Sequence, residues 1–116
     1  MIESAIIIFA IAALMGLYLL TYILRNKVTP KAIALIHGPL GLIGLIILII
    51  YAAGNDSDEN HIVSIILFTA AAAGGLVLIT KDILNMSVPK WLAIMHGLIA
   101  VTAFVIILVK ECERIF

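Results

Sequence analysis

The chain has 116 residues, of which 65% are hydrophobic and 12% are charged, and its mean hydropathy is +1.29. A soluble domain of this size carries about a quarter charged residues, so the composition excludes an ordinary soluble domain and favours an integral membrane protein in contact with a lipid bilayer. The formal net charge is zero, so nothing points to nucleic acid as a partner. Cys112 is the single cysteine, which excludes an intramolecular disulfide.

Four apolar segments follow one another along the chain, at about 2–24, 32–53, 62–80 and 91–109. Each has about 20 residues, the length that a helix needs to cross about 30 Å of hydrocarbon. In lipid every backbone polar group must be paired within the protein, which favours helices over isolated strands. The connections are short and make neighbouring helices antiparallel. The sequence therefore predicts an all-α, integral membrane four-helix bundle with up-down-up-down topology, in a single membrane domain spanning 1–116.

The distribution of basic residues predicts the orientation of this bundle. Five basic residues flank the first and third connections: Arg25, Lys27, Lys31, Lys81 and Lys90. The opposite side carries only Lys110 and Arg114. The positive-inside rule therefore places the first and third connections in the cytoplasm, and we expect both termini to lie outside it, in a bacterial inner membrane.

Two stretches have the same pattern, PKAIALIHG at Pro30–Gly38 and PKWLAIMHG at Pro89–Gly97. An offset of 59 residues aligns the two halves without a gap and also pairs Phe9 with Phe68, Gly16 with Gly75 and Asn26 with Asn85. We interpret this as a tandem duplication of a helical hairpin, with repeats at about 2–53 and 61–112. Because each repeat has two spans, both cross in the same sense, as parallel repeats about a pseudo-two-fold axis along the membrane normal.

His37 and His96 occupy equivalent positions in this alignment, roughly 6–9 Å below the cytoplasmic edge by helical rise. Ionisable residues inside a membrane are expensive and suggest function, although a hydrogen bond to a neighbouring helix is the structural alternative. The second and fourth helices are diagonal in a square bundle, roughly 11–14 Å apart from a neighbour spacing of about 8–10 Å. Two histidines that share one metal need Cα atoms on the order of 13 Å apart. A planar macrocycle between them would fit, whereas a bare metal would have only two protein ligands.

Small residues accompany each histidine. Gly41 and Gly44 follow His37 at i+4 and i+7, Ala100 and Ala103 follow His96 at the same spacings, and Gly16 and Gly75 match on the first and third helices. A porphyrin needs small residues where it approaches the backbone, and close helix packing is the alternative.

Histidines on diagonal helices of a membrane four-helix bundle, each followed by a glycine (Gly38 and Gly97), resemble the haem-binding core of membrane b-type cytochromes, namely cytochrome b and the cytochrome b561 group. The resemblance implies one bis-His haem b, ligated by His37 and His96, and electron transfer with an unidentified redox partner. Those families carry a second histidine pair about four turns on, where this chain has Tyr51 and Lys110, so we expect one haem per chain. Lys31 and Lys90 would anchor the propionates, or snorkel to the interface.

Two other functions stay open. A small proton-coupled transporter would use the histidine pair, since histidine titrates near neutrality. A structural or assembly subunit of a larger membrane complex would suit the small size and short loops, and small residues on the first and third helices leave a homodimer open. A membrane oxidoreductase is compatible with the cytochrome interpretation, but no nucleophile constellation or phosphate loop indicates a reaction. We interpret His61 as a loop histidine.

Overall fold

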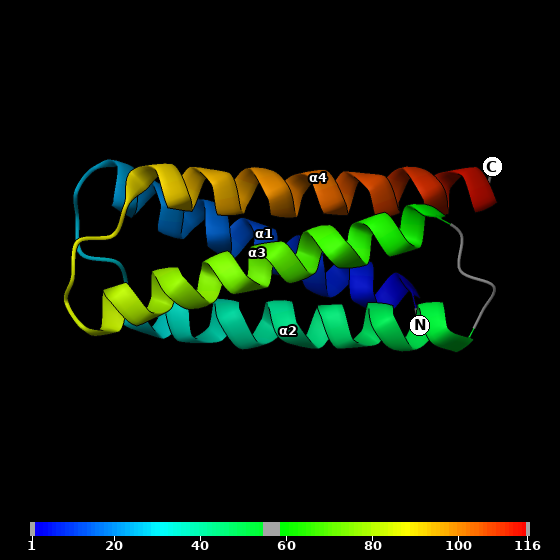
Figure 1. Cartoon of the computed structure of the whole chain (residues 1–116), viewed down its shortest axis with the longest axis horizontal. Helices are drawn as coiled ribbons and strands as arrows, with labels where there is room; N and C mark the ends of the chain where they lie inside the picture. Colours follow the sequence, from blue (N-terminus) through cyan, green and yellow to red (C-terminus); the bar gives the residue numbers. More distant parts are fainter. Residues whose placement is uncertain (1, 55–58, 116) are drawn as a thin grey trace.

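The computed structural model describes residues 2–54 and 59–115 and shows an all-α bundle (Figure 1). The four helices of this part of the chain are α1 (Ile2–Leu24), α2 (Lys31–Gly54), α3 (Glu59–Ile83) and α4 (Lys90–Ile115). They run along the long axis of a body that measures 44 × 22 × 21 Å. Each helix is long and apolar enough to cross a membrane, which confirms the predicted helical class and the four candidate spans.

The largest difference from the predicted segments is at the polar ends of α3 and α4. We predicted that these helices end at about residues 80 and 109, but they continue to Ile83 and Ile115. The added residues include Lys81, Lys110 and Arg114, which are good helix formers that a hydropathy criterion leaves out. The helices therefore extend beyond the apolar segments by up to two turns.

The four helices form a square in which sequence neighbours are also spatial neighbours. α1 contacts α2 and α4, and α3 contacts α2 and α4, so α1 and α3 form one diagonal and α2 and α4 the other. The α1–α2 and α3–α4 turns lie at the same end of the bundle, here the turn end, and the first residues of α1 and the last residues of α4 lie at the other, here the terminal end (Figure 1). The helices that carry His37 and His96 therefore face each other across the bundle centre.

The α1–α2 and α3–α4 turns share one backbone geometry. Asn26 and Asn85 both have φ of 57°, the left-handed conformation that asparagine tolerates better than most residues. The next residue in each turn donates a backbone hydrogen bond to the carbonyl five residues earlier, Lys27 to Tyr22 at 2.9 Å and Met86 to Lys81 at 2.8 Å. These bonds are typical of a Schellman motif, which ends a helix and satisfies its last carbonyls.

Prolines precede the helices that leave these turns. Pro30 and Pro89 lie immediately before α2 and α4, and their carbonyls accept hydrogen bonds from the amides of Ala34 and Ala93. A proline here sacrifices no helical hydrogen bond, because the first amides of a helix have no intrahelical partner. Pro39 is different, since it lies inside α2 and cannot donate to the carbonyl four residues earlier.

Aromatic stacking fills the middle of the bundle. The rings of Phe9 from α1 and Phe68 from α3 stack with centroids 4.0 Å apart and planes 4° apart. Gly44 of α2 lies against this pair, and a Cβ added there would be 2.9 Å from Cε1 of Phe9. The stack therefore joins α1 and α3 across the middle of the bundle. Leu48 and Ile107 extend the apolar core toward the terminal end.

Polar contacts join the α1–α2 pair to the α3–α4 pair at both ends of the bundle. At the turn end, Nζ of Lys31 lies 2.7 Å from Oδ1 of Asp82, and the Thr29 hydroxyl donates to Oδ2 of the same carboxylate at 2.7 Å. At the terminal end, Arg114 of α4 contacts Glu3 of α1 at 3.3 Å and also pairs with the buried carboxylate of Glu111. Each of the four helices therefore contributes a side chain to a polar contact between the two hairpins.

Candidate functional site

The imidazoles of His37 and His96 meet across the α2–α4 diagonal. Their ring centroids lie 6.2 Å apart, and the two ring planes are nearly perpendicular, at 84°. Both residues are only partly accessible. The backbones of α2 and α4 do not approach each other closely, so side chains bridge this diagonal. The structure therefore brings together the two residues that the sequence singles out.

A backbone carbonyl holds the ring of His96. Nδ1 of His96 lies 2.7 Å from the carbonyl oxygen of Ala71 on α3. A carbonyl can only accept, so Nδ1 must carry the hydrogen and donate it. In the neutral imidazole, Nε2 then keeps its lone pair and is the atom available to a metal or a proton.

The ring of His37 has the corresponding neighbour but a weaker contact. The carbonyl of Ala12 on α1 lies near the His37 imidazole, and Ala12 is 59 residues before Ala71. The geometry falls short of a hydrogen bond, and Nδ1 of His37 is buried without a partner among the described residues. The two histidines therefore differ, because among the described residues Nδ1 of His96 has a carbonyl partner and Nδ1 of His37 has none.

Gly16 and Gly75 make room for the imidazoles themselves. A Cβ at Gly16 would lie 3.0 Å from Cε1 of His37, and a Cβ at Gly75 would lie 3.0 Å from Cε1 of His96. Each ring therefore packs directly on the backbone of the preceding helix in its own hairpin. We predicted that these glycines border a porphyrin. Their observed role is to seat the histidines, and contact with a cofactor stays a prediction.

The other predicted glycines have different surroundings. Gly44 is covered by the Phe9 ring, about 10 Å from His37 by the rise of seven residues along α2. A Cβ at Gly38, Gly41 or Gly97 would meet no atom within 4 Å. Gly38 and Gly97 directly follow the histidines and so point about 100° away from them. The cofactor-binding role of these four glycines stays a prediction.

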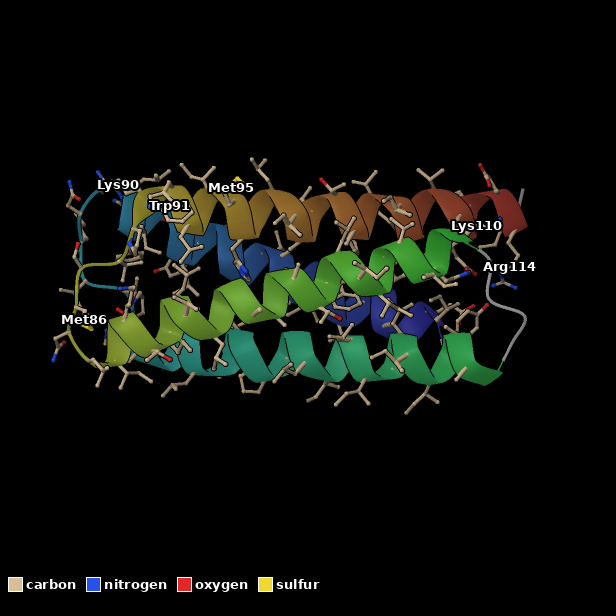
Figure 2. The ribbon with its side chains drawn as sticks, viewed as in Figure 1. Met86, Lys90, Trp91, Met95, Lys110 and Arg114 are labelled. Carbon is tan, nitrogen blue, oxygen red and sulfur yellow. The ribbon has the colours of Figure 1, made fainter. Side chains whose placement is uncertain are left out.

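The two predicted anchoring lysines differ from each other. The Lys31 ammonium is held by Asp82, through the carboxylate at 2.7 Å and the backbone carbonyl at 3.2 Å. A propionate would therefore compete with Asp82 for Lys31. Lys90 lies at the turn end, beside Trp91, with its side chain exposed (Figure 2). Ile23 occupies the position in the first hairpin that Asp82 has in the second, so the equivalent partner of Lys90 is apolar.

The terminal end holds a second aromatic and ionisable group. The rings of Tyr51 and His61 lie 5.6 Å apart. The loop interpretation of His61 is wrong, because α3 begins at Glu59 and His61 lies in its first turn. Polar residues at the start of a helix read as loop by hydropathy, which explains the error. Figure 2 shows Lys110 and Arg114 at this same end, far from Lys90 and Trp91.

Sequence reasoning missed several residues that build the site. The carbonyl of Ala71 orients His96, and no side-chain motif signals a backbone acceptor. The sequence contains a signal for the Phe9–Phe68 stack, because the two phenylalanines match at the 59-residue offset. Met95 directly precedes His96, and it points outward with 48% of its surface exposed (Figure 2).

Among the residues that the structure describes, the site offers two imidazoles, and no carboxylate or thiolate forms a metal-binding cluster with them. Within residues 2–54 and 59–115, no cluster of three or more histidine, cysteine, aspartate or glutamate side chains could hold a metal ion. Two histidines alone leave a bare transition metal short of the four ligands that zinc usually takes in proteins. The donor set instead suits a metal whose remaining ligands come from a cofactor, or a proton shared between the rings.

No protein-family model, no curated protein and no solved structure matches the chain. The function must therefore be argued from the site itself.

Proposed function

We propose that this chain is a small membrane b-type cytochrome that binds one haem b through His37 and His96 and transfers electrons. The observation that carries the proposal is the separation of the two imidazoles. Two rings that share one metal through bonds of about 2 Å place their centroids roughly 6 Å apart, and the measured value is 6.2 Å. His37 and His96 would together hold the iron of the haem. The perpendicular ring planes are compatible, since each ring can rotate about its bond to the metal.

The hydrogen-bonding of His96 supports the same assignment. Its Nδ1 donates to the Ala71 carbonyl, so the neutral ring presents the Nε2 lone pair. A hydrogen bond of this kind fixes the tautomer and ring orientation of a ligating histidine. When bound, the haem would supply one-electron redox chemistry. The residues of this chain would hold the iron, and the surrounding apolar helices would exclude water from it.

The proposal includes the arrangement of the whole chain. We propose that α1–α2 and α3–α4 are tandem parallel repeats in an up-down-up-down bundle, with the turn end in the cytoplasm of a bacterial cell. The support is the repetition of local geometry at the 59-residue offset: the Asn26 and Asn85 turns, and the contact of each histidine with the glycine of its own hairpin. Both ligands would then lie at one depth in the bilayer.

The test is the visible spectrum of the purified protein, with variants of all three histidines. Protein from haem-replete cells should show a Soret band and a sharp reduced α-band after dithionite. Either His37→Ala or His96→Ala should abolish the six-coordinate spectrum, because each removes one axial ligand. His61→Ala is the matched control, since it removes a partly buried histidine at the terminal end, and it should leave the spectrum unchanged. A colourless wild type that also fails to take up added hemin would contradict the proposal.

A proton-coupled transporter is the second candidate, and one observation favours it. Asp82 is a carboxylate at the turn end with only 15% of its side chain exposed. The same bundle holds two imidazoles whose ring centroids are 6.2 Å apart. Intramembrane carboxylates and histidines form proton pathways in transporters. Proteoliposomes should then show proton uptake driven by a substrate gradient, and this uptake should be lost in His37→Ala and in Asp82→Asn.

A further inference from the structure

The lipid-facing surface of the first hairpin carries an open apolar groove between α1 and α2. Leu14, Met15, Tyr18 and Ile33 line this groove, which has a volume of about 320 Å³. Leu14 and Tyr18 are 69% and 45% exposed, so the groove opens outward rather than into the bundle. In a bilayer an outward apolar groove of this size is filled by hydrocarbon, such as part of an acyl chain.

Polar groups lie just above the groove, toward the turn end. The hydroxyls of Tyr18 and Tyr22 are 3.0 Å apart, and the Arg25 guanidinium lies over the Tyr22 ring at 5.2 Å. In a pair of tyrosine hydroxyls only one hydrogen lies between the oxygens, so the second remains available to donate. Nε of Arg25 is bound to the carbonyl of Thr21, and Nη2 reaches the Thr21 hydroxyl at 3.5 Å, which leaves further guanidinium donors.

These features stand in the order in which a phospholipid would need them. Arg25 is at the end of the membrane span and is exposed, which suits a phosphate. Along α1 from Arg25, the tyrosines come about one and two turns further into the span, where the ester groups of a lipid would lie, and the groove follows at Tyr18 and Leu14. The turn end has five basic residues and one acid, Asp82, which Lys31 already neutralises. We propose that the first hairpin binds one anionic phospholipid, with its phosphate on Arg25 and one acyl chain in the groove.

The second hairpin supplies an internal comparison. At the 59-residue offset the groove residues become Ala73, Gly74, Val77 and Leu92, and the residue equivalent to Arg25 is Leu84. The site is therefore specific to one hairpin and does not follow from membrane insertion alone. It is also independent of the histidine pair and of any haem.

Native mass spectrometry of the full chain in mild detergent tests this site. The protein is titrated with phosphatidylglycerol and with phosphatidylcholine of the same acyl chains. We expect one phosphatidylglycerol to bind more tightly than phosphatidylcholine, and Arg25→Leu to weaken its binding by about five-fold, the loss of one favourable charge contact. Tyr18→Val, which copies the second hairpin, should weaken both lipids because it opens the groove and removes a hydroxyl.

Lys81→Leu is the matched control, since it removes one positive charge from the turn end in the second hairpin, and it should leave binding within the scatter of the wild type. Arg25 and Tyr18 are exposed, so the variants should keep the unfolding temperature of the wild type. Arg25→Gln gives a second, polar test of the charge. Equal binding of the two lipids, no effect of either Arg25 variant, or an equal effect of Lys81→Leu would each overturn the proposal.

Discussion

At the scale of single residues, glycines decide where large side chains can lie in this bundle. Gly16 and Gly75 let each histidine ring rest on a neighbouring backbone, and Gly44 does the same for Phe9. An alanine at any of these positions would press a methyl group against an aromatic ring. Gly41, one turn from Gly44 on the same helix, has no such neighbour.

This difference gives a paired prediction for the stability of the protein without cofactor. Gly44→Ala places a Cβ 2.9 Å from Cε1 of Phe9, and the Phe9 ring cannot retreat freely because it stacks on Phe68. Overpacking of this kind costs about 1–3 kcal/mol of the free energy of unfolding. Gly41→Ala should instead stabilise α2 by about 0.5–1 kcal/mol through backbone entropy. Unfolding in mixed micelles measures both variants, and a loss of stability in both would show that helix packing, rather than the Phe9 contact, dominates.

The histidines show how far residue patterns can predict a site. The two His-Gly patterns and the 59-residue offset predict that His37 and His96 belong together, and the structure brings their rings to 6.2 Å. The sequence does not predict that Nδ1 of His96 donates to a main-chain carbonyl, because every residue has one and only the helix packing selects Ala71. It also does not predict that Lys31 pairs with Asp82, since the two residues are 51 positions apart and the pairing depends on the α2–α3 contact.

At the scale of elements, two asparagine turns set the path of the chain. Asn26 and Asn85 follow α1 and α3 in the same left-handed conformation, and prolines come immediately before α2 and α4. Neighbouring helices of each hairpin can then pack along their whole lengths. The apolar spans were predictable from hydropathy, whereas the ends of α3 and α4 were not, because polar helix formers extend them.

The turns give a prediction about side-chain chemistry. Asn26→Ala and Asn85→Ala should each destabilise the protein by about 1 kcal/mol, since a left-handed conformation costs a residue with an ordinary Cβ roughly 1–2 kcal/mol. Asn26→Gly and Asn85→Gly are the controls and should be neutral or slightly stabilising, because glycine adopts this conformation freely. Thermal unfolding of the four variants in one detergent compares them, and equal losses in the alanine and glycine variants would assign the effect to the asparagine side chain.

At the scale of the whole molecule, the two hairpins are held together by an apolar centre and by a polar contact at each end. The contacts between hairpins, α1 with α4 and α2 with α3, are less extensive than those within them. The Lys31–Asp82 pair at the turn end and the Arg114–Glu3 pair at the terminal end therefore act where the assembly is weakest.

A double-mutant cycle on Lys31→Met and Asp82→Asn measures the turn-end contact. Asp82→Asn keeps an oxygen for the Thr29 hydroxyl but removes the charge, so the cycle isolates the ion pair. The Lys31 side chain is 42% exposed, which limits the coupling to about 1 kcal/mol, and added salt should reduce it further. Strict additivity of the two substitutions in low salt would mean that the ion pair contributes nothing to holding the hairpins together.

Asp82 has a further consequence, because it is one of the charged residues that have no charged equivalent in the other hairpin. A site with true two-fold symmetry would accept an asymmetric planar ligand in two poses related by a half-turn, with equal populations. Asp82, which Lys31 and Thr29 hold, lies at the turn end of α3, and the equivalent position in the first hairpin is Ile23. A ligand with acidic groups on one side would feel unlike charges in the two poses. Asp82 would therefore make one of the two poses of such a ligand more favourable than the other.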